Sequence, residues 1–359
     1  FGDFHSGKKS ISKLALRIFN HGAYQKSACV AIQTVVGQLN LGFDVNIAGH
    51  AAGAPASYFG KHDFSQAGRN GKEQGSSIWD VPGLEAWHGK DVFLTEALTV
   101  EACREVREAV EKDKPFFLYL AHYAVHTPLM ADPRFVDHYP NIHPKEAVYA
   151  SMVEGMDKSL KDVLDLLDEL KIADETLVLF LSDNGGYSLG GRGGENFTHN
   201  KPLSSGKGSA HEGGTRVPMI ARWPGVVEPG SVCPTPVIVE DFLPTLMEVA
   251  GAPIPEQAEG IPFTPLLRGE AMDTSERNFI WHQPNTWTHI VDRQGLGPHS
   301  SMRRGDWKVI FYHDPLRNPR WELFNLAEDI GEADNLASRM PDRLAKMAGM
   351  LTQELKARD

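Results

Sequence analysis

The chain has 359 residues, of which 41% are hydrophobic and 23% charged, and its formal net charge is -11 at pH 7. This composition is typical of a globular protein long enough for one large domain and one small domain. The negative charge excludes a general binder of nucleic acid or of anionic membranes, which would carry a basic stripe. No segment approaches the ~18 consecutive apolar residues of a membrane span.

Regular elements are predicted from about Asp91 onwards, since the preceding part of the chain has little hydrophobic patterning. Thr95 is predicted to cap a helix that runs to Lys112, because a threonine oxygen can accept from the first-turn N–H groups. The continuous apolar run 115–121 predicts a strand buried on both faces. Apolar residues at steps of three and four then predict a long amphipathic helix that ends near Lys171.

A second buried strand is predicted at 176–181, and it ends at Ser-Asp-Asn-Gly-Gly, residues 182–186. Helix followed by strand, with polar residues at the carboxyl end of the strand, indicates an α/β fold in which ligands bind at that edge. The segment 262–269 indicates a domain boundary. The remaining predicted elements are a strand at 217–223, a helix at 242–250, two strands at 307–311 and 321–325, and a final helix at 341–358.

The pair Asp183-Asn184 offers a carboxylate and an amide oxygen, which are hard ligands suited to calcium or magnesium. Two ligands are too few for such an ion, so a metal site needs others from elsewhere in the chain. The alternative is an ordinary turn after a strand, because Asn and Gly tolerate left-handed backbone angles.

Lys207 lies between two glycines, Gly206 and Gly208, where unobstructed backbone allows close approach to an anion. A nucleotide-binding P-loop is excluded, because the glycine and the Ser or Thr that such a loop requires are replaced by Lys201 and Gly208. The alternative is a solvated lysine in a turn.

His126 follows the first buried strand, where an imidazole can protonate a leaving oxygen or bind an anionic one. A lone histidine at a strand end is also a common structural residue. In the segment 212–218, two glycines before a charged strand start indicate tight backbone packing, and Arg216 is predicted to pair with an internal carboxylate.

Taken together, the order and spacing of these motifs resemble the sulfatase family of the alkaline-phosphatase superfamily, from about Gly42 to the C-terminus. The motifs that carry the resemblance are Ser-Asp-Asn-Gly-Gly at 182–186, Gly-Lys-Gly at 206–208, Glu-Gly-Gly-Thr-Arg-Val-Pro at 212–218 and Trp-Pro-Gly at 223–225. Further similar segments are 116–120 with His126-Thr127-Pro128, 241–246, 304–308, 322–326 and 335–337.

The resemblance implies an alkaline-phosphatase-like α/β sandwich with a large, mainly parallel sheet between helices. We therefore expect a catalytic domain at residues 1–269, lacking its N-terminal part. A small C-terminal α+β subdomain with an antiparallel sheet is expected at 270–359. The sheet's first strand is expected to be missing, which would leave a neighbouring strand edge unpaired.

The resemblance also implies the chemistry of the site. Asp183 and Asn184 match ligands of a Ca2+ (or Mg2+) ion, Lys207 matches the lysine that holds the sulfate and the leaving oxygen, and His126 matches the histidine on the leaving-group side. His282 and His299 lie in a region that often rims the substrate pocket of sulfatases, and a packed hinge with surface histidines is the alternative. Cationic side chains would offset charge that grows on the leaving oxygen.

The nucleophile of the family is a formylglycine, which a formylglycine-generating enzyme makes from Cys or Ser in a Cys/Ser-x-Pro-x-Arg motif. This chain has no such motif and no N-terminal Asp-Asp motif, and Gln38 and Asn40 stand where the family has a lysine and a histidine. The chain is thus either an incomplete member or a degenerate, non-catalytic one. The start at Phe1 instead of Met, together with the missing strand, favours the former, and we expect the chain as given to be inactive and to bind calcium weakly.

For the intact protein the prediction is hydrolysis of a sulfate ester, with a sulfated small molecule or glycan as substrate and with neither nucleic acid nor membrane as a partner. Two alternatives stay open: a phosphomonoester or phosphonate hydrolase of the same superfamily, and a non-catalytic anion-binding protein. The family implies a periplasmic or extracellular location.

Overall fold

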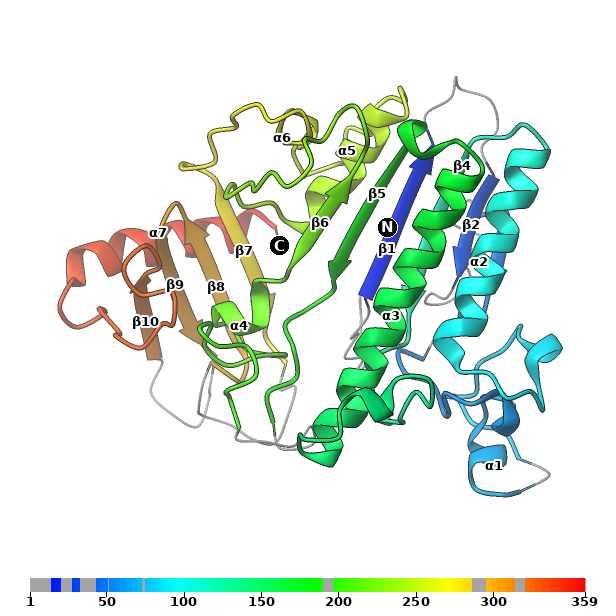
Figure 1. Cartoon of the computed structure of the whole chain (residues 1–359). Coiled ribbons are helices and arrows are strands. Elements are labelled where there is room, and N and C mark those ends of the chain that lie inside the picture. Colours follow the sequence, from blue (N-terminus) through cyan, green and yellow to red (C-terminus); the bar gives the residue numbers. More distant parts are fainter. Residues whose placement is uncertain are drawn as a thin grey trace. The chain divides into compact units, whose positions relative to one another are not determined.

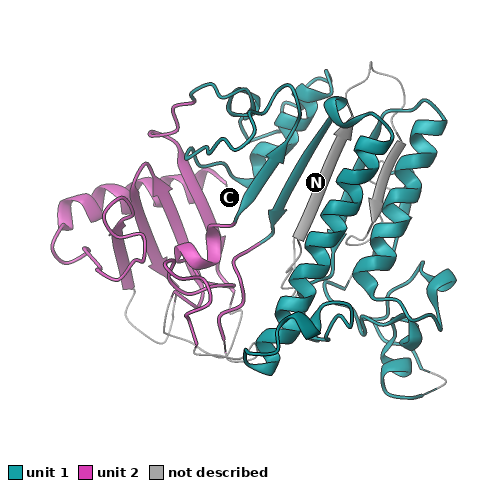
Figure 2. Ribbon diagram, viewed as in Figure 1, with its two compact units in different colours: residues 1–183, 218–271 teal, residues 184–217, 272–359 magenta. Residues whose placement is uncertain are grey.

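The computed structural model describes residues 14–20, 28–32, 43–50, 52–72, 75–189, 196–285, 295–313 and 320–358 (Figure 1). The chain forms two compact units, which are residues 1–183 with 218–271 (unit 1) and residues 184–217 with 272–359 (unit 2; Figure 2). The expected domains, 1–269 and 270–359, assign segment 184–217 differently, and as domains they stay a prediction. Gln38 and Asn40 lie outside the described residues.

Unit 1 contains a sheet of six described strands in the order β3-β2-β4-β1-β5-β6. β2 pairs in parallel with both β3 and β4, whereas β1 pairs antiparallel with β4 and β5, and β6 pairs antiparallel with β5. β3, β2, β4 and β5 therefore share one direction, but three of the five strand pairings are antiparallel, so the described sheet is mixed and not mainly parallel. The strands are β1 Leu14–Asn20, β2 Ala28–Ile32, β3 Val45–Ile47, β4 Phe116–His122, β5 Thr176–Ser182 and β6 Met219–Arg222.

The expectation of a missing strand with an unpaired neighbouring edge was wrong for the described sheet. β1 lies between β4 and β5 and pairs with both along its length. The backbone N–H and C=O groups on the facing edges of β4 and β5 therefore have ladder partners, and a sequence segment without strong patterning supplies them.

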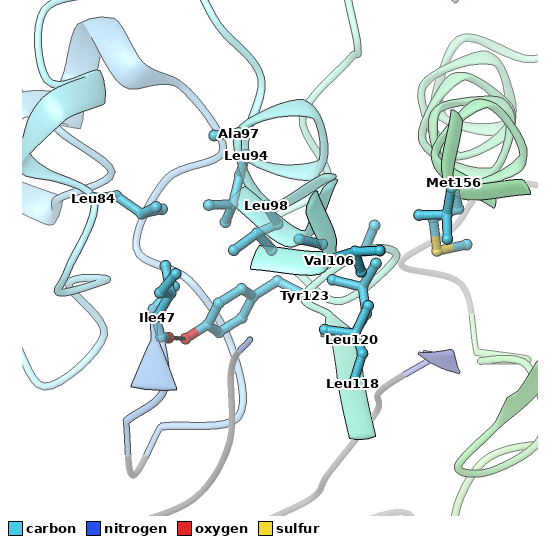
Figure 3. Close-up of a cluster of buried hydrophobic side chains, with 14 of the residues drawn as sticks. Ile47, Leu84, Leu94, Ala97, Leu98, Val106, Leu118, Leu120, Tyr123 and Met156 are labelled. Atoms are coloured by element: carbon cyan, nitrogen blue, oxygen red, sulfur yellow. Dashed lines mark hydrogen bonds between the residues drawn. The ribbon is translucent and has the colours of Figure 1, made fainter. Parts of the chain in front are cut away.

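Two long helices, α2 (Leu94–Glu111) and α3 (Pro144–Glu169), cover one face of this sheet (Figure 1). Alternation along β4 directs Leu118 and Leu120 into the core, where they pack with Leu98 of α2 (Figure 3). Each such fully buried side chain contributes about 1.5–3 kcal/mol relative to exposure. The shorter helices of unit 1 are α1 Gln66–Arg69, α5 Phe242–Val249 and α6 Thr264–Leu267.

The predicted cap at Thr95 was wrong, because α2 begins one residue earlier and no side chain caps it. The extended backbone of Phe93 precedes the helix, and the Leu94 N–H donates to the Tyr58 carbonyl at 2.8 Å. A tertiary backbone contact thus satisfies one of the first-turn donors that a side-chain cap would otherwise serve.

Unit 2 contains an antiparallel sheet of four described strands in the order β10-β9-β8-β7. Helix α7 (Pro341–Ala357) packs on one face, against Met302, Val309 and Leu323. On the other face, Ala210 packs with Ile310 and Phe324, so the segment that contains α4 (Glu212–Thr215) lies there. The strands are β7 Asn278–Gln283, β8 His299–Arg304, β9 Trp307–Tyr312 and β10 Arg320–Asn325.

The antiparallel C-terminal sheet and the mixed α/β unit agree with the predicted fold class. No helix in the described ranges is both long enough and apolar enough to cross a membrane.

Candidate functional site

Three polar side chains of unit 1 follow strands that run in the same direction, so they come from the same edge of the sheet. His50 lies just after β3, His126 just after β4 and Asp183 directly after β5. The last residues of β4 and β5 both stand opposite Leu14, on either side of β1. Two strand spacings, about 10 Å, therefore separate the two strand ends. This edge is where α/β sheets place their ligands.

The turn that carries His126 is fixed by Tyr58, which is fully buried. The Tyr58 hydroxyl lies 2.7 Å from the Tyr123 carbonyl oxygen and 2.8 Å from the His126 carbonyl oxygen, and it donates to them. The His126 N–H also donates to the Tyr123 carbonyl at 2.9 Å. Burial, followed by the field of Tyr123, raises the pKa of Tyr58 well above 10.0, so the hydroxyl keeps the proton that it donates.

His50 was not singled out from the sequence, and the same network orients it. The Tyr123 hydroxyl lies 2.9 Å from the Ala48 carbonyl and 2.6 Å from His50 Nδ1 (Figure 3 shows Tyr123 directed towards Ile47). Because the carbonyl can only accept, the arrangement that satisfies both contacts has Tyr123 donating to Ala48 and His50 Nδ1–H donating to Tyr123. His50 Nε2 is then the ring atom that can accept.

In unit 2, backbone hydrogen bonds bring together the three glycine motifs singled out from the sequence. The Lys207 N–H donates to the Gly186 carbonyl at 3.1 Å, which fixes the lysine beside the turn that begins with Asn184. The Gly185 N–H donates to the Gly214 carbonyl at 3.0 Å, and the Gly213 N–H donates to the Ser204 carbonyl at 2.8 Å. The three motifs, which are separated in the sequence, therefore form one packed set of turns.

These turns approach one another so closely that only glycine fits. A Cβ on Gly185 would lie 1.7 Å from the Gly213 carbonyl oxygen, and one on Gly213 would lie 2.2 Å from the Ser204 oxygen. Asn200, which no sequence pattern marked, adds a side-chain bond, with its Nδ2 donating to the Gly186 carbonyl at 2.9 Å. Backbone packing therefore fixes the main chain at Lys207.

Glu212 anchors these turns to the C-terminal sheet through buried charges. The fully buried Lys308 Nζ lies 2.9 Å from Glu212 Oε1 and 3.0 Å from Glu332 Oε1. Arg216 Nε donates to Glu212 Oε2 at 2.7 Å, which confirms the predicted pairing of Arg216 with an internal carboxylate. Burial alone would raise the pKa of Glu212, but the fields of Lys308 and Arg216 outweigh it and lower that pKa.

A second polar contact joins the same segment to the sheet. His211 Nε2 lies 3.1 Å from Glu322 Oε2, to which the Tyr312 hydroxyl donates at 2.8 Å. His211 Nδ1 lies 3.0 Å from Ser204 Oγ. Burial would raise the pKa of Glu322, but the hydrogen bonds from His211 and Tyr312 lower it, so its carboxylate remains charged at neutral pH.

The two histidines predicted to contact substrate lie on opposite faces of the unit 2 sheet. His299 pairs with Gln283 and is buried, with 2% exposed, and its Nδ1 donates to the Gly297 carbonyl at 2.8 Å. His282 pairs with Ser300, is exposed, and has its Nδ1 2.7 Å from the Ser300 hydroxyl. Their roles as substrate contacts stay a prediction.

Asp183 is the last residue of the first segment of unit 1, and Asn184 is the first residue of unit 2. Within the described ranges, no group of three or more His, Cys, Asp or Glu side chains is arranged to hold a metal ion. The pair offers at most about three oxygens, whereas calcium takes about 6–8. The described residues therefore do not fit a complete calcium or magnesium site.

Residues 34–252 match the sulfatase family, and residues 206–359 match the C-terminal region of N-sulphoglucosamine sulphohydrolase. The chain belongs to the sulfatase family. It is 31% identical to a sulfatase of Formosa agariphila over 73% of its length and 35% identical to human steryl-sulfatase over 63%. It spans 49% of the first of these proteins and 37% of the second.

The structure is similar to a crystal structure of Ps i-CgsB, with a TM-score of 0.72 and 28% sequence identity. The similarity covers 92% of this chain and 71% of that one. A structure of the putative sulfatase yidJ from Bacteroides fragilis, with a TM-score of 0.59 and 18% identity, shares the fold over 74% of this chain. These similarities support the alkaline-phosphatase-like fold that the motifs predicted.

Sequence patterns did not single out Tyr58, His50, Lys308 or Glu332. For Lys308 a signal was present, because one lysine interrupts the otherwise apolar run Trp307–Tyr312, and a buried lysine requires carboxylate partners. Tyr58 and His50 lie in a segment without clear periodicity, so no comparable signal marked them.

Proposed function

We propose that the protein to which this chain belongs hydrolyses the sulfate ester of a sulfated glycan. The observation that carries the proposal is the bond from the Lys207 N–H to the Gly186 carbonyl, in a chain of the sulfatase family. It fixes the backbone of Lys207 beside Gly186, the second residue after Asn184, and the motif comparison assigns the pair Asp183-Asn184 to the metal.

Each residue has a proposed part in binding or proton transfer. The Lys207 ammonium would hold a sulfate oxygen and offset charge on the leaving oxygen. His126 would donate a proton to that oxygen, and Tyr58 would hold the His126 turn in place. Formylglycine as nucleophile, a calcium or magnesium ion, and maturation by a formylglycine-generating enzyme belong to the proposal for the intact protein.

A glycan is proposed as the substrate because a structurally similar protein has been crystallised with an oligosaccharide. Ps i-CgsB in complex with k-i-k-neocarrahexaose matches with a TM-score of 0.71 and 26% identity, over 93% of this chain. The proposed substrate is therefore a sulfated oligosaccharide, and a periplasmic or extracellular location is the matching prediction.

The coding sequence upstream of Phe1 tests the reaction type. A Cys-x-Pro-x-Arg or Ser-x-Pro-x-Arg motif there, followed by turnover of sulfated oligosaccharides by the longer protein, is the expected result. Residues 1–359 alone are expected to release no sulfate from an aryl sulfate above the level of a Lys207→Ala variant. Release above that level would contradict the assignment of the nucleophile to another segment.

A further inference from the structure

Lys308 is fully buried near the start of β9 and faces the segment that contains α4. Its ammonium lies between two carboxylates, Glu212 at 2.9 Å and Glu332 at 3.0 Å. A lysine is rarely buried completely, and the second carboxylate compensates for the water that the ammonium loses. The position therefore has a chemical requirement beyond filling space.

Glu212 is held from two directions by the C-terminal part of the chain. Its backbone N–H donates to Glu332 Oε2 at 2.5 Å, and its carboxylate contacts both Lys308 and Arg216. Arg303 Nη1 lies 3.8 Å from the same carboxylate. Main chain and side chain of one residue are thus fixed by charges from β8, β9 and the loop after β10.

Glu212 is connected to the turn that contains Lys207 through closely packed backbone. The next residue, Gly213, donates to the Ser204 carbonyl, and Gly214 accepts from Gly185. The backbone segments are in such close contact that no side-chain atom fits between them. A Cβ on Gly214, for example, would lie 2.3 Å from the Ser209 carbonyl oxygen. A shift of Glu212 must therefore displace the turns at 185–186 and 204–207, because close-packed backbone cannot absorb it.

We propose that Lys308 is a positioning residue, which holds Glu212 and through it the turns that place Lys207 beside the Asn184 turn. The catalytic part of this inference rests on the proposed sulfate-binding role of Lys207. The C-terminal sheet then positions Lys207 through the buried cluster of Lys308, Glu212 and Glu332. The charges of this cluster fix the orientation of the segment that contains α4, whereas an apolar contact would only fill volume.

Hydrogen exchange of the 1–359 chain tests the geometry independently of any activity. In Lys308→Met, peptides covering 184–189 and 204–214 are expected to exchange about tenfold faster or more, while the β8–β9 ladder keeps its protection. Lys308→Arg is expected to restore part of the protection. Arg339→Met is the matched control, because its partner Asp334 and its own side chain are both exposed.

Equal acceleration throughout unit 2 would overturn the proposal, because it would show a merely stabilising role. If Lys308→Met does not fold, Glu332→Gln removes one carboxylate charge while keeping the side chain's size, and the same pattern is expected. No change at 204–214 in Glu332→Gln would overturn the proposal equally.

Titration with inorganic sulfate separates this inference from the proposed function. Binding that Lys207→Ala abolishes and Lys308→Met weakens about tenfold or more supports both. A second outcome is faster exchange confined to 184–189 and 204–214 in Lys308→Met, with the same sulfate affinity in wild type and Lys207→Ala. This outcome would support the positioning role of Lys308 and overturn the sulfate-binding role of Lys207. Full sulfate affinity in Lys308→Met overturns the positioning role.

Discussion

Units 1 and 2 place their candidate site residues by different physical means. In unit 1, an apolar core between the sheet and helices α2 and α3 aligns parallel strands, and His126 and Asp183 follow the ends of two of them. In unit 2, Lys207 lies in a turn and not in a helix or strand. Glycine-to-backbone packing and a buried set of charges around Glu212 hold it instead.

The difference teaches that the two halves should respond to different perturbations. Apolar burial is non-directional and depends little on pH, so unit 1 should be sensitive to lost volume. Buried ion pairs and backbone contacts are directional, so unit 2 should be sensitive to single charges and single methyl groups.

The largest expected effect is on unit 1. Leu118→Ala removes a fully buried side chain from β4 and should lower the free energy of unfolding by about 2–5 kcal/mol. Val100→Ala on the exposed face of α2 is the control and should change it by less than about 0.5 kcal/mol. Urea unfolding measures both, and equal effects would show that the core is not where stability resides.

The next effect is on pH dependence and should be shared by both units. Burial lowers the pKa of His122 to about 4 in unit 1, and burial likewise lowers that of His299 to about 4 in unit 2. Below pH 6.5 these two imidazoles are protonated in the unfolded chain but stay neutral in the folded chain until the pH approaches 4. Stability is therefore complete above pH 6.5 and falls towards pH 4, by about 3 kcal/mol for each histidine.

Unfolding free energies at several pH values between 7.5 and 4 check this expectation. Replacing both histidines by glutamine should flatten the slope between pH 6.5 and 4.5. Glu212 and Glu322, whose pKa values are lowered, lose their contributions only at lower pH, below about 4.5. An unchanged slope in the double variant would assign the acid sensitivity to other groups.

A single methyl group should distinguish the backbone packing of unit 2. Gly213→Ala introduces a Cβ 2.2 Å from the Ser204 carbonyl oxygen, so the turns must shift, at a cost of about 2 kcal/mol or more. Gly349→Ala in α7 meets nothing within 4 Å and should instead stabilise the helix by about 0.5–1 kcal/mol. Thermal unfolding of the two variants in opposite directions is the expected outcome.

A smaller effect sharpens the assignment of His126 to unit 1. Tyr58→Phe removes the donor to two carbonyls of the His126 turn and should destabilise the chain by about 1–2 kcal/mol. The His126 ring signals in an NMR spectrum should also shift, whereas Tyr139→Phe should leave them in place. Unmoved His126 signals in Tyr58→Phe would mean that other contacts fix the turn.

The smallest expected effect is on metal binding. Because Asp183 and Asn184 are the only matched ligands, residues 1–359 should bind calcium more weakly than micromolar, with little heat in a calorimetric titration. Micromolar binding that Asp183→Ala abolishes would show that the chain holds a complete site.

The sequence by itself determined the elements of unit 1 from α2 to α5, whereas β1, β2 and β3 were not predicted. Periodicity predicted β4, β5 and α3 to within a few residues, because steady burial of one face leaves a regular apolar pattern. The same reading placed His126 and Asp183 after strands, and the order of the glycine motifs identified the family. The cap at Thr95 was mispredicted, because a distant backbone group serves the helix start.

Only the tertiary structure decided how the glycine motifs meet, that β1 fills the gap between β4 and β5, and that Lys308 pairs with Glu212 and Glu332. The physical reason is that these contacts join residues far apart in the chain and have no period. A hydrophobic pattern reports burial at neighbouring positions of the chain. A hydrogen bond between two turns, or an ion pair across a sheet, depends instead on the path of the backbone in the folded chain.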